Sequence, residues 1–157
     1  MLGKLIVSFL FSASPFGEMK IALPIAMNHP GINEWAALFF CIAGNLMVYP
    51  IVERLMSNYG TFLFKTKTAK KGLIKVRTHT KNKTGKLINK YGFWGLMIFV
   101  MVPLPGTGAY LGSVAAYVFG IDKKSAFYAI SIGIVLSGFL LFATIKAAEQ
   151  GWNLVQP

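Results

Sequence analysis

Polarity divides the chain into two apolar blocks, residues 1–57 and 91–146, on either side of a polar stretch, residues 58–90. In the second block, the segment from Ser125 to Ile145 contains no charged residue. In the first block, the segment from Trp35 to Val52 is also uncharged. Because about 20 apolar residues suffice to cross the hydrocarbon core of a bilayer, the pattern predicts one transmembrane helix in each segment.

The second block begins with an apolar segment that does not match one crossing. Residues 91–121 are uncharged, but two crossings need about 40 residues and one needs about 20. In the middle, residues 103–108 include two prolines and two glycines, which disfavour a continuous helix. We expect two half-length helices that meet at a non-helical tip, which is a re-entrant hairpin that enters and leaves the membrane on one side. A single kinked span is the alternative.

The first block has the same order of features. Apolar residues run from Leu2 to Ser14, the segment from Pro15 to Lys20 interrupts them, and Ile21 to Met27 resumes the apolar pattern. This predicts a first hairpin ahead of the Trp35 span. The alternative for residues 1–14 is a signal-like segment, because Lys4 precedes an apolar run that ends in small residues.

The two blocks also align with each other. A shift of 89 positions superimposes every glycine of the first block on a glycine of the second. The pairs are Gly3 with Gly92, Gly17 with Gly106, Gly31 with Gly120, and Gly44 with Gly133. Because one crossing separates equivalent points, the two units would face opposite ways, as inverted repeats do in many transporters. Their tips would then approach each other near the middle of the membrane.

Composition supports lipid as the solvent. Hydrophobic residues make up 55% of the 157 residues and charged residues 13%, about half the charged fraction of soluble domains. We therefore predict an all-α integral membrane protein. It would be one membrane domain: a first repeat (1–57), a connector (58–90), a second repeat (91–146) and a tail (147–157). The single cysteine, Cys41, excludes an internal disulfide framework.

The net charge of +11 lies mainly in the connector. Ten of the 16 basic residues are there, with no acidic residue: Lys65, Lys67, Lys70, Lys71, Lys75, Arg77, Lys81, Lys83, Lys86 and Lys90. The positive-inside rule places such a loop in the cytoplasm, where it can attract anionic lipid. Nucleic acid is not an expected partner, because the run has neither interleaved aromatic residues nor a recognisable binding module.

A few polar residues at membrane depth are candidates for chemistry. Glu18 and Lys20 belong to the first tip, and Asn45 lies within the first span. An ionisable residue at such depth indicates a functional site. Glu18 would exchange a coupling proton and Lys20 would hold an anionic head group. The alternative is that the two simply pair with each other or lie at the interface.

The second tip is a candidate anion-binding element. Its backbone N–H groups, together with the positive end of the following half-helix, could bind an anion. The residues concerned are Pro103, Pro105, Gly106, Thr107, Gly108 and Tyr110. The alternative is a tight turn without a ligand. No metal, cofactor or enzymatic activity is expected, because the sequence has no HExxH, GxSxG or acidic cluster.

Two motifs resemble a known family. The segment from Gly17 to Ala26 (GEMKIALPIA) resembles the Glu-Leu-Arg-Gly-Ala-Ile-Pro segment of the small multi-drug export proteins, and it includes Pro24. The segment from Pro103 to Tyr110 (PLPGTGAY) resembles their Pro-Leu-Pro-Gly-Thr-Gly-Ala-Trp signature. Lys20 stands where the family has arginine. The family resembles the DedA/VTT proteins, which implies two opposed re-entrant hairpins and proton-coupled movement of polyprenyl phosphates or phospholipids. The second hairpin lacks the arginines that DedA proteins carry there.

Together these features predict a small transporter in the cell membrane. It would move an amphiphilic or anionic lipid-like substrate, or small drugs, with membrane lipids and protons as partners and a homodimer as its assembly. The alternative is a non-transporting membrane scaffold or assembly factor with a lipid-binding basic loop.

Overall fold

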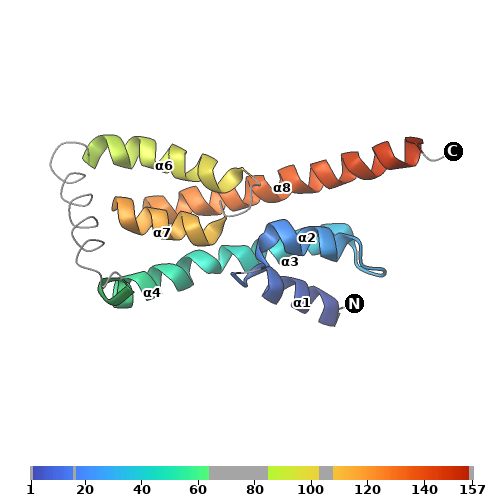
Figure 1. Ribbon diagram of the computed structural model, residues 1–157, viewed down its shortest axis with the longest axis horizontal. Helices are drawn as coiled ribbons and strands as arrows, with labels where there is room; N and C mark the ends of the chain where they lie inside the picture. Colours follow the sequence, from blue (N-terminus) through green and yellow to red (C-terminus); the bar gives the residue numbers. More distant parts are fainter. Residues whose placement is uncertain (1, 16, 64–84, 103–107, 156–157) are drawn as a thin grey trace.

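A computed structural model describes the chain except for residues 1, 16, 64–84, 103–107 and 156–157 (Figure 1). All secondary structure in this part is helical, as the sequence predicts. The helices are α1 (Leu2–Ser12), α2 (Glu18–Met27), α3 (Glu34–Leu46), α4 (Val48–Leu63), α6 (Gly85–Met101), α7 (Ala109–Phe119) and α8 (Lys123–Val155).

Two helical segments in the described part are long and apolar enough to cross a membrane. The first runs from Glu34 to Tyr59 and combines α3 with most of α4, which are separated only at Met47. The second is the part of α8 from Lys123 to Trp152. Each contains one of the two segments that the sequence predicts to cross the membrane, and each extends beyond that segment at both ends.

The two long segments begin in the same way. Just before them, Gly31 and Gly120 adopt positive φ angles of 83° and 68°, a region that disfavours residues with a side chain. Asn33 and Asp122 then cap the helices. The side chain of each accepts hydrogen bonds from the backbone N–H groups two and three residues later, at 2.9 and 3.3 Å for Asn33 and at 3.1 and 3.3 Å for Asp122. Both pairs of residues are 89 positions apart.

The short helices form two pairs at opposite ends of the long segments (Figure 1). At the end that holds the N-terminus, α1 and α2 contact each other and α3. At the other end, α6 packs against α8, and α7 packs against α4 and α6. Because α6 and α7 lie side by side, the chain reverses direction between Met101 and Ala109 and does not continue as one kinked helix.

Glycines allow the first helix of each pair to approach a long helix closely. A Cβ added at Gly44 of α3 would overlap the carbonyl oxygen of Phe9 in α1. A Cβ added at Gly133 of α8 would lie 2.8 Å from the carbonyl oxygen of Met97 in α6. Gly44 and Gly133 are one of the glycine pairs related by the shift of 89 positions.

Helical structure extends into the expected connector and the expected tail. Helix α4 continues to Leu63 and α6 begins at Gly85, so both ends of the expected connector are helical. Helix α8 continues to Val155, through most of the expected tail. The central connector, residues 64–84, lies outside the described residues.

The core is small and the outer surface is apolar. Met19, Leu23, Ile130 and Ile134 are among the largest fully buried side chains. Large apolar side chains also cover much of the outside: Leu2, Val7, Leu10, Trp35, Phe39, Ile51, Trp94, Leu111, Phe119 and Leu140 are all exposed. Extensive apolar exposure is unusual for a soluble monomer and typical of a surface that contacts lipid or another protein.

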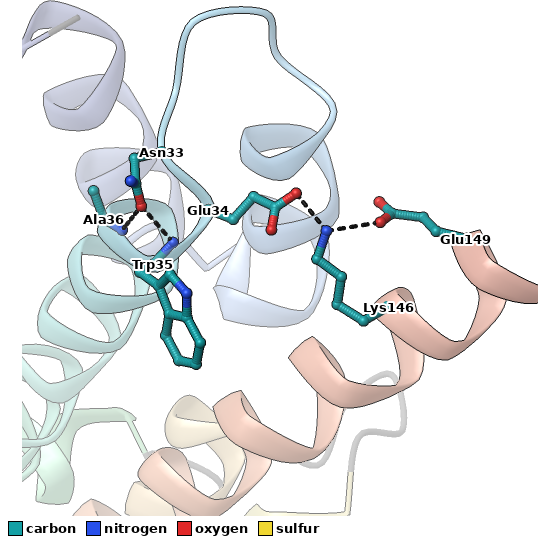
Figure 2. A network of polar contacts seen from close by, with 6 residues as sticks. All are labelled: Asn33, Glu34, Trp35, Ala36, Lys146 and Glu149. Atoms are coloured by element: carbon teal, nitrogen blue, oxygen red, sulfur yellow. Dashed lines mark hydrogen bonds and ion pairs between the residues drawn. The ribbon is translucent and has the colours of Figure 1, made fainter.

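Ion pairs connect the two long segments near both ends. Lys146 Nζ lies 2.5 Å from Glu34 and 2.9 Å from Glu149, and Figure 2 shows this cluster beside the start of α3. At the opposite end, Lys123 Nζ lies 2.5 Å from Glu53 and donates to Ser57 Oγ at 3.2 Å. Because α3 and α4 together run antiparallel to α8, the pairs of Lys146 with Glu34 and of Lys123 with Glu53 join residues far apart in the sequence.

Candidate functional site

The turn that follows α1 directs Glu18 toward the second helix pair. Ser14 Oγ donates to the carbonyl of Phe11 at 2.8 Å and accepts from the N–H of Gly17 at 2.9 Å. A Cβ added at Gly17 would overlap the carbonyl oxygen of Phe11, so the turn requires glycine at this position. Helix α2 begins at Glu18, immediately after this glycine.

The carboxylate of Glu18 lies at the N-terminus of α7. The backbone N–H of Tyr110 donates a hydrogen bond to it, and a Cβ added at Gly108 would overlap both carboxylate oxygens. The first N–H groups of a helix have no partner within the helix, and the helix dipole favours a negative charge there. Glu18 thus provides an acceptor for one N–H at the end of a helix that belongs to the other half of the chain.

Tyr110 makes a second contact with the same turn. Its hydroxyl donates to the carbonyl of Ala13 at 2.5 Å, while its N–H donates to Glu18. One residue of α7 therefore binds both ends of the turn between α1 and α2. We call the contacts among Ala13, Glu18, Gly108 and Tyr110 the tip contact.

The segment matched by a known protein family begins at Glu18. A family model described as "Putative small multi-drug export protein" matches residues 18–140, which include the first motif except for Gly17, the whole second motif and the residue of α7 in the tip contact. The chain belongs to this family. No curated protein and no solved structure matches it. The family's description supports a role in transport, and the apolar helices support a membrane protein.

Lys20 and Pro24, both in the first family motif, lie on α2. Lys20 is partly buried and interacts electrostatically with Glu18, so the region of the tip contact holds one positive and one negative side chain. Pro24 lies inside α2 and is partly buried. Its ring removes one backbone donor from the helix. Lys20 is therefore placed to act with Glu18, whereas Pro24 shapes the helix.

Asn45 is buried in α3, with 3% of its surface exposed. Among the residues that the structure describes, none donates a hydrogen bond to its Oδ1. A buried amide oxygen without a donor costs about 1–3 kcal/mol, so Asn45 remains a candidate for binding a polar group. The hydrogen bonds of the tip contact do not include it.

Four of the expected site residues lie outside the described residues. They are Pro103, Pro105, Gly106 and Thr107. Of the others, the structure brings together Glu18, Lys20, Gly108 and Tyr110. The described part of the chain contains no group of three or more His, Cys, Asp and Glu side chains that could hold a metal ion.

Sequence reasoning missed two features of this region. The carbonyl of Ala13 is an acceptor in the tip contact. The type of a residue does not show whether its backbone carbonyl accepts a hydrogen bond from a distant side chain. The ion pair between Glu34 and Lys146 was also missed. A signal for that pair existed, because two antiparallel spans of similar length place the charges flanking one span opposite those flanking the other.

Proposed function

We propose that this protein is a transporter built from two inverted repeats, each a re-entrant hairpin followed by a membrane-spanning segment. The helix order is consistent with this arrangement: α1, α2 and then α3–α4 in the first half, and α6, α7 and then α8 in the second. The matching caps and glycine contacts, 89 positions apart, support the repeat. In this arrangement the protein lies in the cell membrane with its basic connector in the cytoplasm.

The substrate class we propose is an anionic, lipid-like molecule such as a polyprenyl phosphate or a phospholipid. The observation that carries this proposal is the Glu18 carboxylate at the N-terminus of α7. A helix end that accepts a carboxylate has the donors and the electrostatic potential that a phosphate group requires. Lys20 provides a positive charge nearby, and the exposed apolar side chains are compatible with acyl or prenyl chains.

We further propose that Glu18 exchanges the coupling proton. It is a carboxylic acid that is partly removed from water and bonded to a backbone N–H of the other hairpin. Loss of its charge would weaken that bond, because hydrogen bonds to ionised groups are stronger than those to neutral groups. Protonation would in this way be linked to the arrangement of the two tips.

The test is transport by the purified full-length protein in proteoliposomes. The substrates would be a fluorescent phosphatidylglycerol, a fluorescent farnesyl phosphate and the cationic dye ethidium, each measured with and without a pH gradient. We expect flux of one or both anionic lipids that rises with the gradient in the wild type and is lost in Glu18→Gln. Glu149→Gln removes a carboxylate at the far end of α8 and should leave flux unchanged. Unchanged flux in a folded Glu18→Gln protein would remove Glu18 from the coupling step, and flux of ethidium alone would contradict the substrate class.

A further inference from the structure

The Glu18 carboxylate occupies the place where an anionic substrate would bind. The N-terminus of α7 directs its backbone donors to one region, and in this structure Glu18 is in that region. The fit is close, since the carboxylate lies directly against Gly108 and leaves no space for a Cβ. A phosphate group and the Glu18 carboxylate therefore cannot occupy this helix end together.

The backbone of Glu18 is strained in the same conformation. Its φ angle is 31°, and it is the only residue other than glycine with a positive φ in the described part of the chain. Residues with a side chain avoid this region, and holding one there costs about 1–3 kcal/mol. The contact with α7 helps to offset that strain, so a Glu18 released from α7 could relax to an ordinary backbone conformation.

We propose that Glu18 is a displaceable latch between the two hairpins: an anionic head group takes its place on α7, and binding of the substrate thereby separates the tips. This proposal rests on the anionic substrate class proposed above. Substrate binding and release of the turn between α1 and α2 are then one event. An empty transporter stays closed because its own carboxylate satisfies α7.

Other groups near the latch fit this exchange. The charged and titratable side chains that act on Glu18 in the described residues are Lys20 on α2 and Tyr110 on α7. Lys20 can neutralise whichever anion is present, Glu18 or substrate. Tyr110 keeps a separate, uncharged contact through its hydroxyl and Ala13. Protonation of Glu18 should weaken the latch in the same direction as displacement by substrate.

The first test is binding to the full-length protein in phosphatidylcholine nanodiscs, with farnesyl phosphate and inorganic phosphate as probes. The two probes distinguish a lipid head group from a free phosphate. Because Glu18→Gln removes the competing charge, it should bind farnesyl phosphate about threefold to tenfold more tightly than the wild type, the effect expected of one charge at a helix end. Glu149→Gln should bind as the wild type does. Equal or weaker binding by a folded Glu18→Gln protein would overturn the latch.

The second test measures tip separation directly. Spin labels at Leu10 of α1 and Leu111 of α7 would report the distance between the hairpins, since both side chains are exposed and the native Cys41 is fully buried. We expect farnesyl phosphate to lengthen this distance in the wild type, and Glu18→Gln to lengthen it without ligand. If farnesyl phosphate binds the wild type and the distance stays the same, the latch is wrong and the substrate class stands. If neither phosphate binds either protein but Glu18→Gln separates the tips, the substrate class is wrong and Glu18 closes the tips for another purpose.

Discussion

Glu34 lies 2.5 Å from Lys146, and the residues 89 positions away from each of them, Lys123 and Ser57, are also in contact, at 3.2 Å. If each residue is replaced by its equivalent 89 positions away in the other half, the contact between Glu34 and Lys146 becomes the contact between Lys123 and Ser57. A twofold axis between the long segments relates contacts in this way. The charges differ between the two contacts, so the relationship lies in the positions rather than in the residue types. It supports the proposed inverted repeat more strongly than the matching glycines do.

The ion pair between Glu34 and Lys146 should stabilise the end of the two long segments at which α3 begins. We expect Glu34→Gln to lower the thermal midpoint of the detergent-solubilised protein, because it removes one of the two carboxylates that contact Lys146. The same substitution should have less effect when Lys146 is already methionine, and this double-mutant cycle isolates the pair. Equal effects of Glu34→Gln in both backgrounds would show that the pair contributes nothing, as many exposed pairs do.

The close glycine contacts should be equally important in the two halves. Gly44→Ala and Gly133→Ala each place a methyl group against the backbone of a neighbouring helix. We expect each substitution to destabilise the protein by about 1–3 kcal/mol, the usual cost of overpacking. Gly3→Ala and Gly151→Ala are matched controls, because a Cβ at either position meets nothing within 4 Å. Urea unfolding monitored by circular dichroism would compare the four variants. If Gly44→Ala and Gly133→Ala were as stable as the two control variants, the helices would not be packed closely at these glycines.

Gly108→Ala should disrupt the tip contact without removing any polar group. Its methyl group would take the place of the Glu18 carboxylate, so we expect the spin-label distance between Leu10 and Leu111 to increase. Gly95→Ala is the control, because a Cβ at Gly95 of α6 meets nothing within 4 Å and alanine is favoured over glycine within a helix. A Gly108→Ala protein with the wild-type distance would show that Glu18 can hold the tips from another position.

Tyr110→Phe tests the uncharged part of the tip contact. The substitution removes the hydrogen bond to the carbonyl of Ala13 and keeps the backbone N–H that binds Glu18. We expect a loss of stability of about 0.5–1.5 kcal/mol, typical of one hydrogen bond, with transport reduced but still dependent on the pH gradient. Thermal unfolding and flux in proteoliposomes would measure both. Loss of the gradient dependence would mean that the hydroxyl takes part in the proton step.

Hydropathy and helix-breaking residues predicted the order of the helices but not how far α4, α6 and α8 extend into the connector and the tail. The uncharged segments predicted the two long helices, and Pro103 to Gly108 predicted the break between α6 and α7. The tip contact was less predictable, since the partner of Glu18 is a backbone N–H in a helix more than 90 residues later. Side-chain type carries no information about such donors. The alternative in which Glu18 simply pairs with Lys20 describes only part of its surroundings, because α7 provides a second partner.

The topology of the proposed inverted repeat can be tested by labelling single cysteines in intact cells. His29 and Lys124 are suitable positions: both are exposed, and they lie next to the equivalent turns at Gly31 and Gly120. The native Cys41 is fully buried and should not react. If one crossing separates the two turns, a membrane-impermeant maleimide should label His29→Cys from outside and Lys124→Cys only after the cells are opened. The cytoplasmic assignment of the basic connector predicts this direction, because α8 begins at the same end as α4 finishes (Figure 1). Labelling of both cysteines from the same side would contradict the inverted repeat and the transport mechanism built on it.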